Sequence, residues 1–338
     1  MRHIVLTSRP DAETKSRWLA MLADADMPTH YTTPDIFDDA FVGDGERFAV
    51  LAEDGGEFVA VLTGIVNAGR VTSGFAVRPQ AAFRNGADRE AAFASLIDGV
   101  NTLAADAELI DIHLWQRLSN TPRTFTEREG HGADKVVLLD LRKGADLLFS
   151  EFSERRRTHL RRYMRMKALE IKQLENECEL GELYAIHKTW SAGKGIEPDK
   201  LDSFRTLIGA VYRKTLIAVH KGRVIAGSYF RFCPGGVVEY AANNSRKEFQ
   251  RLGPNEMLIW HAIQWACGAS FRTFSMGASH PFLLRFGGEP VSTWRYRCDR
   301  SFLSIHTNRE RIGRIAFNTY NAIPETIKRR IRSARAAY

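Results

Sequence analysis

The sequence predicts an α/β protein made of two tandem units, each a mixed sheet flanked by helices, and three observations support this fold class. Apolar residues make up 44% and charged residues 26% of the chain, which is typical of globular proteins. The length of 338 residues suits one large domain or two of ordinary size. One pattern of strands and helices also occurs twice, about 160 to 170 positions apart, which indicates duplication of one α/β unit.

Each unit begins with a predicted β-hairpin and a third strand. The hairpins consist of apolar strands around a turn that contains glycine, at 48–52 and 58–66 in the first unit and at 216–219 and 224–232 in the second. The third strands are predicted at 71–77 and 237–242. A chance match of coarse patterns is the alternative to duplication.

A helix, a buried strand and a last strand follow in each unit. The predicted helices cover 89–105 and 255–267, and the buried strands cover 109–115 and 272–276. The last strands, at 136–141 and 291–297, are each predicted to close their own unit. This order of elements places helices on the faces of mixed sheets.

An arginine-rich segment lies between the two units. Residues 152–167 contain no Gly or Pro, and their apolar side chains recur at roughly helical spacing. We therefore predict a basic connecting helix here rather than a flexible linker. The predicted domains are residues 1–145, residues 146–305, which begin close to this helix, and residues 306–338, which form one or two basic helices.

The net charge of +8 is concentrated in two clusters. One lies in the predicted connecting helix, and the other closes the chain with Lys328, Arg329, Arg330, Arg332 and Arg335. Concentrated positive charge attracts anionic partners over a long range. The sequence leaves three such partners open: nucleic acid, a nucleotide-linked donor and an anionic membrane surface.

Several classes of protein are disfavoured by the composition. The longest apolar run, near Val59–Leu62, is far shorter than the roughly 20 residues of a membrane span. The first residues reach Thr7, Ser8 and Arg9 too soon for a signal-peptide core, so we expect a cytoplasmic protein. The four cysteines are scattered without Cys-x-x-Cys spacing, so neither a disulfide framework nor a metal site is predicted.

The segment from Tyr240 to Met257 carries the strongest functional signal. A predicted strand ends in polar residues, a loop with Gly253 follows, and a helix has Pro254 in its first turn. Backbone amides at such a helix start are unpaired and lie at the positive end of the helix dipole. They can therefore hold a phosphate or a carbonyl oxygen. An ordinary strand-to-helix turn is the alternative.

This segment resembles the acyl-CoA loop of the GNAT superfamily, which reads Gln/Arg-x-x-Gly-x-Gly/Ala between a strand and a helix. Gln250, Gly253 and Asn255 fall on that frame, although Asn255 stands where a small residue is expected. The chain is more similar to the FemAB-like branch, which has tandem GNAT-like units, an arginine-rich helix opening the second unit and a Gly-Pro-Asn helix start. Two segments of this chain with glycine turns, Phe274–Ser279 and Phe286–Pro290, resemble the tail of that branch.

Three positions depart from the pattern of these relatives. An acidic residue is common where Ser275 stands, an arginine is common near Ala278, and a Phe-Lys pair is common where the chain has Phe282 and Leu283. The departures leave the donor, the acceptor and catalytic competence open. The alternative to an enzyme is a non-catalytic GNAT-derived protein that uses its basic helices to grip RNA or an anionic surface.

The resemblance implies transfer of an acyl or aminoacyl group to an amine of a peptidoglycan-precursor-like, amino-sugar or peptide acceptor. The co-substrate is acyl-CoA or aminoacyl-tRNA, with no tightly bound cofactor. Such a reaction needs a deprotonated amine, a polarised carbonyl and a proton path to the leaving group. The implied site residues are Glu239, Tyr240 and Asn243 for catalysis; Gln250, Arg251, Gly253, Pro254 and Asn255 for the donor; and Arg157, Arg161, Arg162, Arg165 and Arg285 for the acceptor or tRNA.

Overall fold

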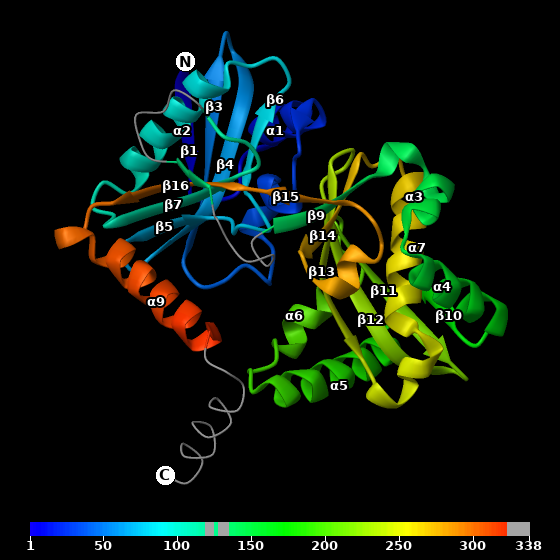
Figure 1. Cartoon of the computed structure of the whole chain (residues 1–338). Coiled ribbons are helices and arrows are strands. Elements are labelled where there is room, and N and C mark those ends of the chain that lie inside the picture. Colours follow the sequence, from blue (N-terminus) through cyan, green and yellow to red (C-terminus); the bar gives the residue numbers. More distant parts are fainter. Residues whose placement is uncertain (119–124, 128–134, 323–338) are drawn as a thin grey trace.

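The structure is a computed structural model that describes residues 1–118, 125–127 and 135–322. Two mixed sheets flanked by helices make up this part of the chain (Figure 1), which confirms the predicted fold class. The helices are α1 (Ala12–Ala23), α2 (Arg89–Leu103), α3 (Ala145–Glu151), α4 (Glu154–Met166), α5 (Glu177–Lys194), α6 (Leu201–Arg205), α7 (Pro254–Gly268), α8 (Pro281–Leu284) and α9 (Ile305–Ala322). Within the described ranges, no helix is both long and apolar enough to cross a membrane.

The first sheet contains nine strands: β1 (Arg2–Leu6), β2 (Ala25–Asp26), β3 (Glu46–Asp54), β4 (Glu57–Asn67), β5 (Arg70–Ser73), β6 (Ala81–Arg84), β7 (Leu109–Leu114), β8 (Phe125–Glu127) and β16 (Trp294–Asp299). Their order is β1-β3-β4-β5-β7-β16-β8, with β6 paired to β4 and β2 to β6. Both faces are covered. Phe48, Val50 and Ala52 of β3 pack on the α2 side, and Ala49 and Leu51 pack on the α1 side. Burial on both faces explains why the middle of this strand, from Phe48 to Ala52, is continuously apolar.

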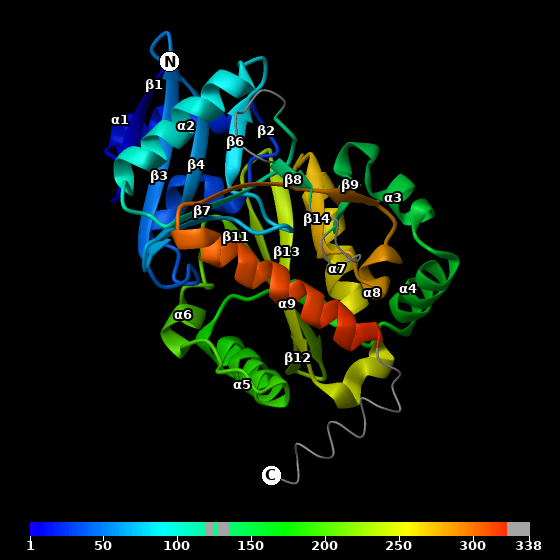
Figure 2. The same ribbon diagram turned by 60° about the vertical axis from the view of Figure 1, so that its left-hand side comes forward.

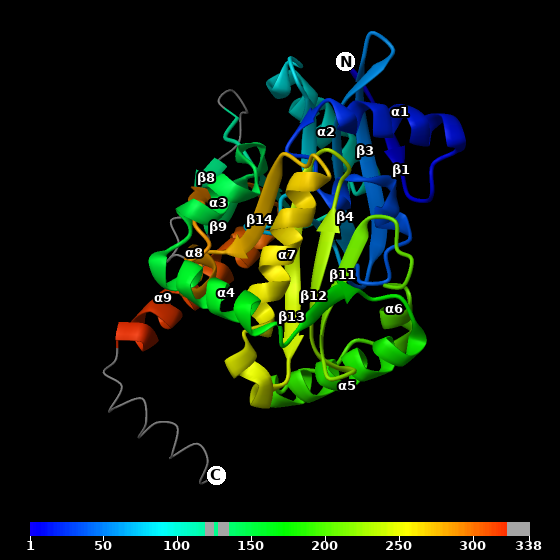
Figure 3. The same cartoon turned by 90° about the vertical axis from the view of Figure 1, so that its right-hand side faces the viewer.

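The second sheet contains seven strands: β9 (Lys135–Asp140), β10 (Glu170–Gln173), β11 (Arg213–His220), β12 (Arg223–Phe232), β13 (Val237–Ser245), β14 (Thr273–Ala278) and β15 (Glu289–Ser292). Their order is β10-β11-β12-β13-β14-β9-β15. Helix α7, with α3 and α4 beside it, covers one face, and α5 and α6 cover the other (Figure 3). We call the first sheet with α1 and α2 the first unit, and the second sheet with α3 to α8 the second unit.

The two units exchange strands. The prediction that each last strand closes its own unit is wrong, because β9 lies between β14 and β15 in the second sheet, and β16 lies between β7 and β8 in the first. The single strand predicted at 291–297 is two strands that belong to different sheets. Thr293, which is buried, links β15 to β16, and Figure 1 shows these two strands. Apolar alternation identifies a strand, but it does not identify the sheet edge that the strand joins.

The predicted basic connecting helix is present as α4, which follows the short helix α3 after a break at Phe152 and Ser153. The Ser153 hydroxyl accepts a hydrogen bond from the Arg156 amide at 3.3 Å and so caps α4. Helix α9 covers the first of the two predicted C-terminal basic helices. The second, predicted at 326–337, lies outside the described residues.

Candidate active site

Strands β13 and β14 pair in parallel over a short distance and then separate. Three residue pairs join them, and the last pair is Glu239 with Ser275. Beyond this pair, β13 continues to Ser245 beside β12, and β14 pairs with β9 at Ala278. Backbone amides and carbonyls at such a divergence can bind an extended ligand that contains amide groups.

Helix α7 begins next to this divergence with no side-chain cap. Its N-cap is Gly253, whose φ of +66° lies in the left-handed region, and Pro254 occupies the first helical position. The amides of Asn255 and Glu256 follow in the first turn, where the helix dipole favours an anion. A side chain at position 253 would lie 2.0 Å from the Tyr163 ring, so glycine is required here.

The predicted donor-binding residues come together around this helix start. Gln250 and Arg251 are exposed on the turn before Gly253, whereas Gly253 and Pro254 are buried. The Asn255 amide nitrogen donates to the Ser245 hydroxyl at 3.2 Å and so ties the start of α7 to the end of β13. The Asn255 side-chain oxygen is buried and has no hydrogen-bond partner in the described part of the chain.

Helix α4 lies beside the start of α7 (Figure 3) and is anchored there by Arg156. Its guanidinium forms a 2.9 Å ion pair with Glu256 and donates to the Phe282 carbonyl at 3.2 Å. The rings of Phe282 and Phe286 lie 4.6 and 4.3 Å from the guanidinium carbon. Arg156 was not among the predicted site residues, although it precedes Leu160 by four positions and so falls on the apolar face.

The five predicted arginines do not all face solvent. Arg161, Arg162 and Arg165 are exposed on α4, and Arg162 lies 4.9 Å from the ring of Tyr163, which in turn contacts Gly253. Exposed Arg285 follows α8. Arg157 is half-buried and donates to the Phe152 carbonyl at 3.0 Å and to the Ser150 carbonyl, so it ties α4 to the end of α3.

The predicted catalytic residues occupy opposite faces of β13. Glu239 is buried beside Arg231 on the face toward the first unit. Tyr240 packs against Phe230 on the α7 side, and Asn243 lies across from Ser228 on that same side. Burial raises the pKa of Tyr240, so its phenol stays protonated near neutral pH. Because the two side chains lie on opposite faces, Glu239 and Tyr240 do not form one continuous proton relay.

Residues of the first unit reach Glu239, and no pattern in the sequence predicts this contact. The Glu239 carboxylate lies 3.4 Å from Arg78 of the first unit and 4.0 Å from Arg231. Arg231 donates to the Tyr31 hydroxyl at 2.7 Å. These partners are far apart in sequence, so only the fold brings them together. The second Glu239 oxygen has no hydrogen-bond partner among the described residues.

A cluster with metal-ligating side chains lies further along this interface. His30, Asp35 and Asp39 are close enough to surround an ion, but the guanidinium of Arg213 binds Asp39. Burial favours the neutral form of Asp39, yet the hydrogen bond to His30 and the Arg213 charge hold its pKa below the usual range. The chemistry of this cluster therefore fits an internal ion-pair network better than a metal site.

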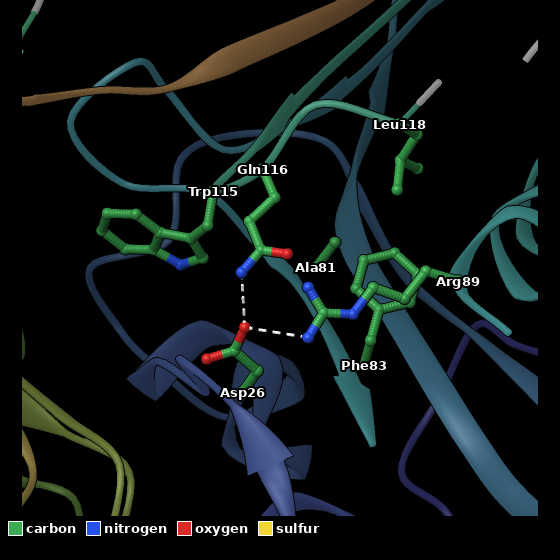
Figure 4. A pocket seen from close by; sticks show the side chains of 7 residues that line it. All are labelled: Asp26, Ala81, Phe83, Arg89, Trp115, Gln116 and Leu118. Atoms are coloured by element: carbon green, nitrogen blue, oxygen red, sulfur yellow. Dashed lines mark hydrogen bonds and ion pairs between the residues drawn. The ribbon is translucent and has the colours of Figure 1, made fainter. Parts of the chain in front are cut away.

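The corresponding region of the first unit is a small pocket lined by side chains of that unit (Figure 4). It lies where β7 ends and α2 begins. Arg89 and Gln116 both donate to Asp26, at 3.1 and 2.6 Å. The Asp88 carboxylate caps α2 by accepting from the amides of Glu90 and Ala91, both at 3.1 Å. This helix start is therefore already occupied by an internal anion.

Comparison with known proteins agrees with this difference between the units. Residues 150–287 match the family model of an acetyltransferase (GNAT) domain, so the second unit carries a GNAT domain, as predicted. GNAT domains use acyl-CoA as co-substrate. No curated protein matches the chain.

Solved structures show that the tandem fold is shared. FemX has a TM-score of 0.63 at 11% identity, covering 89% of this chain and 98% of its own. The C-terminal domain of a lysylphosphatidylglycerol synthetase from Agrobacterium fabrum gives 0.58 at 11%, covering 88% and 96%. A tandem GNAT protein from the clavulanic acid biosynthesis pathway gives 0.52 at 12%, covering 89% and 99%.

The chain therefore has the same tandem fold as these structures. Residues 150–287, which lie in the second unit, match the GNAT acetyltransferase domain, and this match supports an acyltransferase activity.

Proposed function

We propose that the chain transfers an acyl or aminoacyl group from acyl-CoA or aminoacyl-tRNA to an amine of a cell-envelope, amino-sugar or peptide acceptor. The observation that carries this proposal is the uncapped start of α7, which lies where β13 and β14 separate and beside the exposed arginines of α4. Both donors carry phosphates, and both attach the transferred group at the end of a long arm.

The donor phosphates bind at the start of α7. The amides of Asn255 and Glu256 hold one phosphate group, and exposed Arg251 and Arg162 supply positive charge around it. The rest of the donor arm lies along the separating edges of β13 and β14. Asn243, on the same face of β13 as Tyr240, orients the donor carbonyl rather than the acceptor.

The acceptor amine approaches from the face of β13 that carries Glu239. Its nitrogen forms a bond to the acyl carbon, the carbon–sulfur or carbon–oxygen bond of the donor breaks, and Glu239 takes the amine proton. Tyr240, which remains protonated on the opposite face, gives a proton to the departing thiolate or alkoxide. Removal of the amine proton and protonation of the leaving group thus take place on opposite faces of β13. This arrangement fits the alternation of side chains along the strand better than a single relay does.

The donor can be identified by binding across a salt series. We would compare tRNA and acetyl-CoA binding to the wild type and to the double variant Arg162→Ala with Arg165→Ala, since both side chains are exposed. If the donor is tRNA, the logarithmic salt slope flattens by about 2 in the double variant, because two phosphate contacts are lost.

The matched control removes the same charge from the first unit with Arg9→Ala and Lys15→Ala, and its slope should equal that of the wild type. Binding of acetyl-CoA without tRNA binding would identify a thioester donor. Failure of both ligands to bind would contradict the proposed donor site. A location in the cytoplasm is part of the same proposal.

A further inference from the structure

Helix α9 docks on the first unit through its polar side. His306 lies 3.0 Å from the Glu108 carboxylate and accepts a hydrogen bond from Arg70 at 2.9 Å. One turn later, Glu310 accepts from Arg295 and Arg297, each at 2.6 Å. Positions 306 and 310 lie on the same face of a helix, so ion pairs and hydrogen bonds hold this face against the protein.

The outward side of α9 is apolar. Ile305, Ile312 and Ile315 are 45%, 66% and 58% exposed, and Phe302 and Leu303 in the preceding turn are 80% and 72% exposed. Fourteen large apolar residues are exposed in the described part of the chain, and five of them fall within residues 302–315. We call these five side chains the α9 stripe. A helix that docks by its polar face and leaves its apolar face exposed is inverted relative to an ordinary surface helix.

The turn before α9 is strained in a way that displays the stripe. Leu303 and Ser304 have φ values of +53° and +49°. These values lie in the left-handed region, which residues other than glycine rarely adopt. Both Phe302 and Leu303 remain highly exposed despite this conformation. The exposure of Phe302 and Leu303 therefore accompanies an unfavourable backbone conformation that burial of these side chains does not offset.

Positive charge borders the stripe. Arg309 and Arg311 are exposed on either side of it, and Arg314, also exposed, lies one turn from Arg311 and 3.4 Å from Glu310. An apolar stripe between arginines matches the interface of an anionic bilayer, with apolar groups below the headgroups and guanidinium groups among the phosphates. A second copy of the chain fits poorly, because a twofold contact through the stripe would bring like charges together.

We propose that the α9 stripe docks the protein on the surface of an anionic phospholipid bilayer. Helix α9 begins beside the first sheet and extends away from it (Figures 1 and 2). The contacts of His306 and Glu310 fix its first turns and leave the stripe exposed, so that the helix can lie in the plane of the interface. The stripe enters the boundary between headgroups and acyl chains, and the bordering arginines contact lipid phosphates. This inference goes beyond the proposed function, since it depends on neither the donor nor the acceptor.

Co-sedimentation of the full chain with vesicles tests the proposal. The wild type should bind vesicles of equimolar phosphatidylcholine and phosphatidylglycerol, and bind phosphatidylcholine vesicles weakly. Ile312→Ser with Ile315→Ser should lower the bound fraction about tenfold or more, because both side chains leave the interface. The replaced residues are exposed, so folding is unaffected, and a thermal unfolding curve checks this.

Two further variants complete the test. Ile196→Ser with Val211→Ser removes two exposed aliphatic side chains elsewhere, 50% and 72% exposed, and should bind like the wild type. Arg309→Gln with Arg311→Gln should lose the preference for anionic vesicles.

Three results would overturn the proposal. The first is a wild type that does not bind anionic vesicles. The second is unchanged binding by the Ile312→Ser and Ile315→Ser variant. The third is a wild-type dimer in sedimentation velocity that this variant converts to a monomer while neither form binds lipid, which would make a second copy the occupant.

Discussion

The two units begin their central helices in the same place and in different ways. In each unit, a strand, a helix and a second strand parallel to the first follow in order, as β5, α2 and β7 or as β13, α7 and β14. Helix α2 is capped by the carboxylate of Asp88, whereas α7 begins at Gly253 without a side-chain cap. The first unit thus satisfies its helix dipole internally, whereas the start of α7 has no side-chain cap and can accept the anionic donor that we propose.

The strands before the two helices also differ in a polar side chain. The last parallel pair of the first unit contains Ser73, and that of the second contains Glu239. The comparison teaches that one architecture can carry different helix starts, and that the functional distinction we propose between the units lies in a few side chains rather than in the fold.

The largest expected effect comes from removing the carboxylate that marks the second unit. Glu239→Gln should lower kcat between about 100-fold and 10,000-fold, because the amine loses its proton acceptor. Donor affinity should stay unchanged, since Glu239 lies on the face away from α7. Ser73→Ala, the matched change in the first unit, should leave kcat at the wild-type value. Equal losses in the two variants would remove the functional distinction between the units.

The second largest difference is expected in how much the ion pairs at the two helix starts contribute to the free energy of unfolding. Arg156 is 2% exposed and pairs with Glu256, whereas Arg89 and Asp26 are 30% and 33% exposed. Arg156→Ala should lower the free energy of unfolding by about 3–5 kcal/mol, because it leaves a carboxylate uncompensated. Arg89→Ala should lower it by about 1 kcal/mol or less. Urea denaturation of both variants measures these losses. A loss in Arg156→Ala as small as the loss expected for Arg89→Ala would show that the Arg156–Glu256 pair does not anchor α4 on α7.

The glycines that precede the two helices give a smaller contrast. Gly253 and Gly86 have φ of +66° and +78°, but an added Cβ would meet the Tyr163 ring at 2.0 Å in the first case and nothing within 4 Å in the second. Gly253→Ala should therefore destabilise the fold by about 2–4 kcal/mol, from left-handed strain plus overpacking. Gly86→Ala should cost only the strain, about 1 kcal/mol. Thermal unfolding with equal shifts for the two variants would argue against close packing of α4 on the donor loop.

The smallest expected effect concerns the cap of α2. Asp88→Ala should lower the free energy of unfolding by about 1 kcal/mol, because the amides of Glu90 and Ala91 lose their acceptor. Donor binding should be unaffected, because the donor site lies in the other unit. Calorimetry measures the stability, and titration with acetyl-CoA or tRNA measures the affinity. A change in donor affinity would show that the start of α2 takes part in binding.

Much of the fold could be predicted from local patterns. The hairpin strands, α2 and α7 all occur within a few residues of their predicted positions, because apolar runs, glycine turns and the Gly-Pro helix start act locally. The exchange of β9 and β16 could not be predicted, since β7 and β14 each offer an edge and strand alternation does not choose between them. The same limit hides the contacts of Glu239 with Arg78 and Arg231.

The proximity of the predicted donor-binding residues could be predicted from the sequence. The environments of the arginines could be predicted only in small part. Gln250 to Asn255 are close in sequence, so their proximity follows from the chain itself. The arginines of α4 share one composition but have three environments: Arg156 is buried against Glu256, Arg157 binds carbonyls of α3, and Arg162 is exposed. Only the packing of α4 on α7 separates these environments. Helical spacing indicates only the position of Arg156, four residues before Leu160 on the apolar face of α4.

The exchanged strands also determine the order in which the chain can be completed on the ribosome. Domains generally fold as they emerge, beginning at the N-terminus. Here the outer edge of β7 has no partner until Trp294–Asp299 have been made, after the whole second sheet. The unit that is synthesised first is therefore finished last, and until then it presents an open strand edge that can pair with other chains. A nascent chain stalled before Trp294 should be a substrate for chaperones even though most of its residues are already folded.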